Sequence, residues 1–167
     1  MKLKELLNEQ LVNDSDFKFL LDVRAHCEKK AGKLEYPDAL LKRIMLANNK
    51  DKGEDFVEKN YEMSIKELTW HLIKEQLVSA QNIKIEDADI KETAKEAARA
   101  QFAQYGMTNI PEEYIENYAN EILKKGDSTE ALVDRAVDRK LAAALKGVVK
   151  LNEKEISVED FNKMMQG

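Results

Sequence analysis

The chain has 167 residues, of which 43% are hydrophobic and 35% charged, and its net charge is −5. This length fits one ordinary domain or two small ones, and the apolar content is enough for a real core. The acidic balance argues against a nucleic-acid-binding protein, which needs a basic face, and no apolar run reaches the roughly 18 residues of a membrane span. The single cysteine, Cys27, cannot form an internal disulfide and fits a reducing cytoplasm.

The first half of the chain shows the apolar spacing of helices. They are predicted over 2–12, 16–30, 37–47 and 65–81, with a short segment over 53–61. The run Asn13–Asp16 is typical of a helix end followed by a new cap, and Pro37 suits a first helical turn. Ser64 and Glu67 have the spacing of a capping box. The third helix carries its apolar positions at Leu40, Leu41, Ile44, Met45 and Ala47.

The second half is predicted to contain helices over 86–105, 111–125 and 127–146, and a last one that begins at Ser157. Gly106 and Gly126 follow helices as terminators, and Glu86 and Ser157 precede them as caps. The only extended stretch is 148–151. We count about seven helices and at most one strand, which predicts an all-α protein: an elongated multi-helix domain with helical arms.

Residue sets that carry catalysis or bind cofactors are not found. The six glycines never cluster, which excludes a phosphate-binding loop and a dinucleotide fingerprint. His26 and Cys27 point about 100° apart on a helix, so we interpret them as structural. Glu67, His71 and Glu75 share one helix face, and a metal-dependent enzyme built on them is a weak alternative because further ligands are missing. No catalytic residue, metal or cofactor is expected.

The candidate binding residues are apolar side chains of adaptable shape. They flank the turn marked by Gly106 and Pro111 or lie on the last helix: Phe102, Tyr105, Met107, Ile110, Tyr114, Tyr118, Met164 and Met165. Methionine is flexible and tyrosine is amphipathic, so both suit surfaces that accept varied apolar partners. The alternative for any one of them is that it packs the helices together.

Four segments resemble one known family, bacterial trigger factor. Phe102–Gly106, with Pro111 and Tyr118 after it, resembles the second helical arm of its C-terminal domain, and Ser157–Met165 resembles its closing helix. Tyr36–Leu41 is similar to the helix after the first arm, and Leu68–Glu75 to the long helix that follows. The resemblance spans about residues 15–167 and is strongest to the Bacteroides-type versions.

This resemblance implies an ATP-independent chaperone domain that binds unfolded or nascent polypeptides in the cytoplasm, with the apolar residues above lining its cradle. In that family the N-terminal domain docks on the ribosome and a second domain, of the FKBP type, is a prolyl isomerase; neither pattern is present here. We therefore expect a single C-terminal-type domain over 1–167, non-enzymatic, with 1–14 as a loosely packed leading helix. A weak homodimer would be compatible with this function.

Two further alternatives remain. One is a helical scaffold or adaptor module that binds one defined protein partner. The other is the helical domain of a periplasmic chaperone-isomerase, whose fold resembles this one. A chaperone binds many unfolded chains weakly, whereas an adaptor forms a stoichiometric complex with a single sequence.

Overall fold

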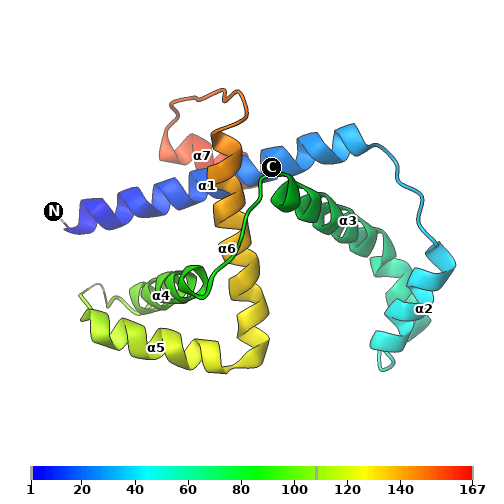
Figure 1. The fold of residues 1–167 in the computed structure, drawn as a ribbon, viewed down its shortest axis with the longest axis horizontal. Coiled ribbons are helices and arrows are strands. Elements are labelled where there is room, and N and C mark those ends of the chain that lie inside the picture. The colour runs from blue at the N-terminus through cyan, green and yellow to red at the C-terminus, as the bar shows by residue number, and fades with distance from the viewer. Residues whose placement is uncertain (1, 108, 167) are drawn as a thin grey trace. The chain divides into compact units, whose positions relative to one another are not determined.

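The computed structural model describes residues 2–107 and 109–166, and within them it contains seven helices and no strand (Figure 1). The prediction of an all-α fold is therefore confirmed. The helices are α1 (Lys2–Ala31), α2 (Asp38–Asn48), α3 (Gly53–Ala80), α4 (Asp87–Gln104), α5 (Glu112–Lys124), α6 (Gly126–Lys146) and α7 (Val158–Gln166). None of these helices is long and apolar enough to cross a membrane.

The chain divides into two compact units, residues 1–77 and residues 78–167. In the first unit, polar contacts tie the helices together. The Arg24 guanidinium on α1 donates to the Glu67 carboxylate on α3 at 2.8 and 3.2 Å. The Lys42 ammonium on α2 donates to both oxygens of Glu58 on α3 at 2.8 Å. The unit is thus organised around α3, which contacts both of the other helices.

Two helix ends predicted in this unit are wrong. The helices expected over 2–12 and 16–30 are a single helix, α1, that runs through Asn13–Asp16. Likewise α3 continues through Ser64, so the capping box is not used. The physical reason is the same in both places: Asn, Asp and Ser each cost a helix interior only about 0.7 kcal/mol at most, and neither segment contains the proline or interior glycine that would force a break.

In the second unit, α4, α5 and α6 pack on one another. The helix starts at Glu86 and Ser157 are confirmed. The Glu86 amide donates to the Asp89 carboxylate at 2.7 Å, and the Asp160 amide donates to Ser157 Oγ at 3.1 Å. Apolar residues of α6 are buried over a wide arc: Leu132 and Leu141 lie about 180° apart around the helix, and both are buried.

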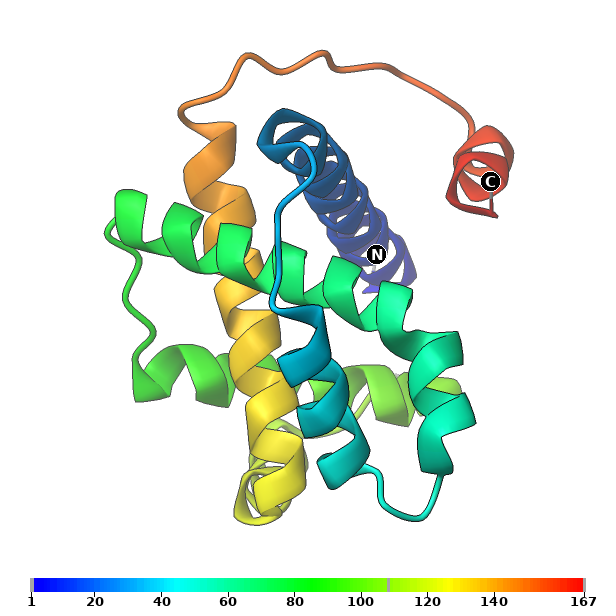
Figure 2. The same cartoon turned by 90° about the vertical axis from the view of Figure 1, so that its right-hand side faces the viewer.

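The segment that joins α6 to α7 is not a strand. The amides of Val148 and Val149 both donate to the Leu145 carbonyl, at 3.0 and 2.9 Å, so the stretch 148–151 begins as a turn that closes α6. The chain then runs as an extended connection to α7, which lies apart from α4, α5 and α6 (Figure 2).

Candidate functional site: an aromatic groove on the α4–α5 hairpin

Small residues let α4 and α5 approach each other closely. Ala94 and Ala98 lie one turn apart on α4, and both are fully buried. Ala119 on α5 is buried with Ala94, and Leu132 of α6 completes the cluster. Because an alanine projects only a methyl group, the two helix backbones can come near without a gap. The hairpin is therefore closed by a thin, tightly packed seam.

Charged side chains close the hairpin along its exposed edge. The Lys95 ammonium on α4 lies 2.5 Å from the Glu116 carboxylate and 3.4 Å from that of Glu112, both on α5. The Arg99 guanidinium donates to both oxygens of Glu112 at 2.9 and 3.0 Å. The hydrogen bond from Arg99 holds the pKa of Glu112 below its usual range, and the bond to Glu116 raises the pKa of Lys95.

A left-handed glycine ends α4 and begins the turn. Gly106 has a φ of 75°, its amide donates to the Ala103 carbonyl at 2.9 Å, and the Met107 amide donates to the Phe102 carbonyl at 3.0 Å. These two bonds form a Schellman motif, in which the residue after the glycine folds back toward the last turn of the helix. The predicted terminator is confirmed, and it sets the direction in which Tyr105 and Met107 leave the helix.

Gly106→Ala is expected to lower the free energy of unfolding by about 1 kcal/mol, because a side chain disfavours the left-handed conformation. A methyl group there meets no other atom within 4 Å, so the loss reflects backbone strain alone. Gly147→Ala is the matched control: Gly147 ends α6 in a right-handed conformation, so its change stays within about 0.5 kcal/mol. Chemical denaturation followed by circular dichroism measures the free energy of unfolding of both variants. Equal losses would contradict the left-handed conformation assigned to Gly106.

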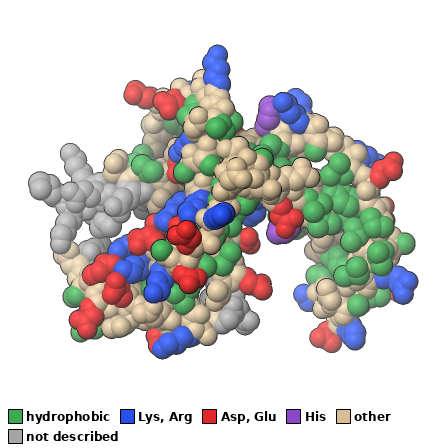
Figure 3. Space-filling view, in the orientation of Figure 1, with side chains coloured by type: hydrophobic (Ala, Val, Ile, Leu, Met, Phe, Trp, Pro, Cys, Tyr) green, Lys and Arg blue, Asp and Glu red, His purple; other side chains and the backbone are tan. Residues whose placement is uncertain are grey.

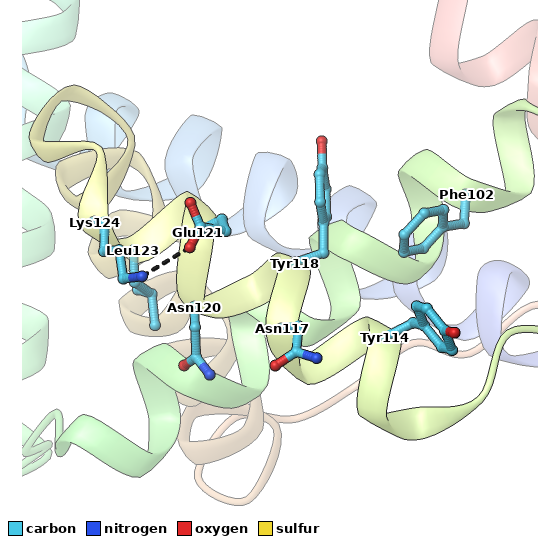
Figure 4. A pocket seen from close by; sticks show the side chains of 8 residues that line it. All are labelled: Phe102, Tyr114, Asn117, Tyr118, Asn120, Glu121, Leu123 and Lys124. Carbon is cyan, nitrogen blue, oxygen red and sulfur yellow. Dashed lines mark hydrogen bonds and ion pairs between the residues drawn. The ribbon is translucent and has the colours of Figure 1, made fainter.

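An open groove of about 770 Å³ runs along the outer side of α5, with Phe102 of α4 at one end. The ring centroids of Phe102 and Tyr118 lie 5.2 Å apart, and the Tyr118 hydroxyl donates to Gln101 Oε1 at 3.0 Å. Figure 4 shows the Phe102 and Tyr114 rings at one end and Glu121 and Lys124 at the other. The groove is lined by Phe102, Tyr114, Asn117, Tyr118, Asn120, Glu121, Leu123 and Lys124.

The structure brings three of the predicted site residues together in this groove: Phe102, Tyr114 and Tyr118. Tyr105 and Met107 lie at the adjoining end of the hairpin. Tyr105 is 72% exposed and Tyr114 64%, so these rings are available to a ligand and do not pack the helices together. Ile110, in the same connection, is only half-exposed.

Met164 and Met165 do not belong to the groove. They lie on α7, where Met164 is exposed and Met165 half-buried, and this helix stands apart from α4 and α5 (Figure 2). The predicted site residues of the second unit therefore fall into two places, the end of the hairpin and the last helix.

A further exposed apolar surface in the first unit escaped the sequence analysis. Hydrophobic side chains gather over α2 and α3 (Figure 3), and the exposed ones include Leu40, Ile44 and Met63. From the sequence, Leu40 and Ile44 are predicted only as apolar positions of the third helix. Together with Leu41 and Met45 they form one continuous apolar arc of about 140° around α2. Leu41 and Met45 are half-buried, whereas Leu40 and Ile44 at the other edge of the arc stay exposed.

The side chains of Glu67, His71 and Glu75 do not come together as a metal site. The Glu67 carboxylate binds Arg24, and His71 Nε2 lies 3.5 Å from Glu75 Oε1 on the surface of α3. Among the described residues, no group of three His, Cys, Asp or Glu side chains is placed to hold a metal ion. Cys27 is half-buried, and burial raises the pKa of its thiol.

Comparison with known protein families identifies the family of this chain. A family model described as "Probable trigger factor, C-terminal domain" matches residues 15–165, nearly the whole chain. The chain belongs to this family. No curated protein and no solved structure gives a significant match. The trigger factor C-terminal domain is distinct from the isomerase domain of these proteins, and the family match coincides closely with the resemblance seen in the sequence.

Proposed function

We propose that this chain is a chaperone module that binds unfolded or nascent polypeptides without ATP, and that the α4–α5 hairpin is one of its binding surfaces. The observation that carries the proposal is the cluster of exposed Tyr105, Met107 and Tyr114 beside the aromatic groove. Monomeric proteins seldom leave such side chains together in solvent unless they bind something. Membership of the trigger factor C-terminal domain family supports this function.

The size of these patches suits reversible binding. Burying one large apolar side chain contributes about 1.5–3 kcal/mol, so two or three contacts contribute no more than about 9 kcal/mol before the entropic costs of association are subtracted, and the resulting complex is weak. A chaperone needs weak binding because a bound segment must leave again to fold. The apolar surface over α2 and α3 offers a second place for such contacts in the other unit.

The remaining expectations are part of the same proposal. The chain acts as one non-enzymatic module in the cytoplasm, and Met164 and Met165 on α7 add to its binding surface. Prolyl isomerase activity is not expected, since the family matched is that of the C-terminal domain.

Suppression of the aggregation of a chemically denatured, unrelated protein tests the proposal. Replacing Tyr105, Met107 and Tyr114 by serine together is expected to weaken suppression clearly while circular dichroism stays unchanged, because all three side chains are exposed. The matched control replaces Val148, Val149 and Leu151 by serine, which removes three exposed apolar side chains from the connection to α7 and leaves suppression nearly intact.

Three outcomes would contradict parts of the proposal. No suppression by the unchanged protein would favour an adaptor that binds one partner, to be sought by pull-down. Equal loss in both triple variants would remove the hairpin from the site. Prolyl isomerase activity in a parallel assay would show that the non-enzymatic assignment is wrong.

A further inference from the structure

We propose that oxidation of Met63, Met107 and Met164 to sulfoxides by hydrogen peroxide lowers the affinity of this chain for unfolded polypeptides. This inference rests on the proposed function, because it concerns how binding at the same apolar surfaces is regulated. Enzymes that reduce methionine sulfoxide restore the apolar side chain, so the change is reversible.

Each exposed apolar surface of the described chain contains one exposed methionine. Met63 on α3 belongs to the surface over α2 and α3, Met107 lies at the end of the hairpin beside the groove, and Met164 lies on α7. Their exposed fractions are between 45% and 64%. The other two methionines of the described residues, Met45 and Met165, are only half-exposed. A small oxidant in solution therefore reaches the three exposed sulfur atoms first.

Oxidation changes the side chain without breaking the polypeptide. The thioether sulfur gives an electron pair to one oxygen of hydrogen peroxide. An S–O bond forms as the O–O bond breaks, and the second oxygen leaves with both hydrogens as water. The sulfur loses the two electrons that the peroxide gains. The product is a polar, chiral sulfoxide in place of a flexible apolar group.

A sulfoxide is poorly suited to the contacts that these surfaces are proposed to make. Its oxygen accepts hydrogen bonds from water, so covering it with an apolar side chain removes those bonds and costs free energy. The unoxidised thioether has no such cost and packs well against aromatic rings. Oxidation is thus expected to weaken binding at each surface that uses its methionine.

The fold itself is expected to tolerate this change. None of the three methionines belongs to the buried core of the described residues, so a polar group at these positions stays in water. The single thiol is a poor competitor for the oxidant. Cys27 is half-buried and burial raises its pKa, whereas the thiolate is the form that reacts.

Fluorescence anisotropy with a labelled, unstructured peptide rich in leucine and phenylalanine tests this proposal. The protein is treated with hydrogen peroxide, separated from it, and then incubated with a thiol, which reverses reversible cysteine oxidation but not methionine sulfoxide. Affinity is expected to fall about twofold to tenfold for each methionine in contact, the range that the strength of sulfur–aromatic contacts implies. Circular dichroism is expected to stay unchanged, and treatment with methionine sulfoxide reductases to restore the affinity.

Leucine variants assign the effect to particular residues. Replacing Met63, Met107 and Met164 by leucine together keeps volume and apolar character, so this variant is expected to bind like the unchanged protein and to keep its affinity after peroxide. The matched control replaces Met45 and Met165 by leucine and is expected to remain sensitive to peroxide, because the exposed methionines are still present. Peptide mapping by mass spectrometry locates the sulfoxides.

The outcomes separate this inference from the proposed function. Equal affinity before and after oxidation, or an equal loss in the triple leucine variant and the unchanged protein, would overturn the inference. The proposed function would then still stand, because the untreated protein binds. A changed circular dichroism spectrum after oxidation would also overturn it, since affinity would be lost through unfolding. If the untreated protein neither binds the peptide nor suppresses aggregation, the proposed function fails and this inference fails with it.

Discussion

Leu132→Ala is expected to lower the free energy of unfolding of the second unit by about 2–5 kcal/mol. Leu132 is only 4% exposed and belongs to the buried cluster with Ala94 and Ala119, so it joins α6 to both helices of the hairpin. Removing its isobutyl group forfeits the transfer free energy and leaves a cavity that two alanines are too small to fill.

Denaturant unfolding followed by circular dichroism measures this loss. Leu40→Ala is the control, because Leu40 is also helical but 53% exposed on α2; its expected loss is no more than about 1 kcal/mol. Similar losses for the two variants would mean that Leu132 does not hold α6 against the hairpin.

Ala94→Leu is expected to destabilise the same unit by about 1–3 kcal/mol, for the opposite reason. Ala94 is fully buried where α4 meets α5, and a larger side chain must push the two helices apart. Ala100→Leu is the matched control on α4: Ala100 faces solvent, and leucine is nearly as good a helix former as alanine, so stability changes by about 0.5 kcal/mol or less.

Ala94→Leu also tests whether the packing of α4 against α5 affects peptide binding. The groove takes Phe102 from α4 and Tyr118 from α5, so moving the helices apart changes the distance between their rings. Ala94→Leu is therefore expected to weaken peptide binding even at temperatures where the protein stays folded, whereas Ala100→Leu leaves it unchanged. Unaltered affinity in the overpacked variant would show that the two rings do not act as one site.

Combining Ala94→Leu with Leu132→Ala tests whether both residues share one space. The added side chain can occupy part of the cavity that the other substitution creates, so the combined loss is expected to be smaller than the two single losses together by about 0.5 kcal/mol or more. Strict additivity would place the two residues in separate environments.

Much of the fold could be predicted because helix ends depend on local chemistry. The starts at Glu86 and Ser157 and the stop at Gly106 were found from single residues, since a cap needs only its own side chain and the next three amides. The predicted breaks at Asn13–Asp16 and Ser64 were wrong for a related reason. Polar residues favour a helix end without enforcing one, and the contacts that decide between the two outcomes lie outside the local window.

The candidate site was predicted only in part. Phe102, Tyr114 and Tyr118 do share a groove. The exposed face of α2 was not found, because a helix pattern says which residues share a side but not whether another helix covers it.

The sequence by itself determined the fold class, most helix ends and the family, because composition, capping and short motifs act over a few residues. Only the tertiary structure decided which apolar side chains are buried and which stay exposed. The physical reason is that burial depends on helices distant in sequence meeting at particular faces. Tyr118 packs its ring against Phe102 while Tyr114, one turn away on the same helix, remains in solvent.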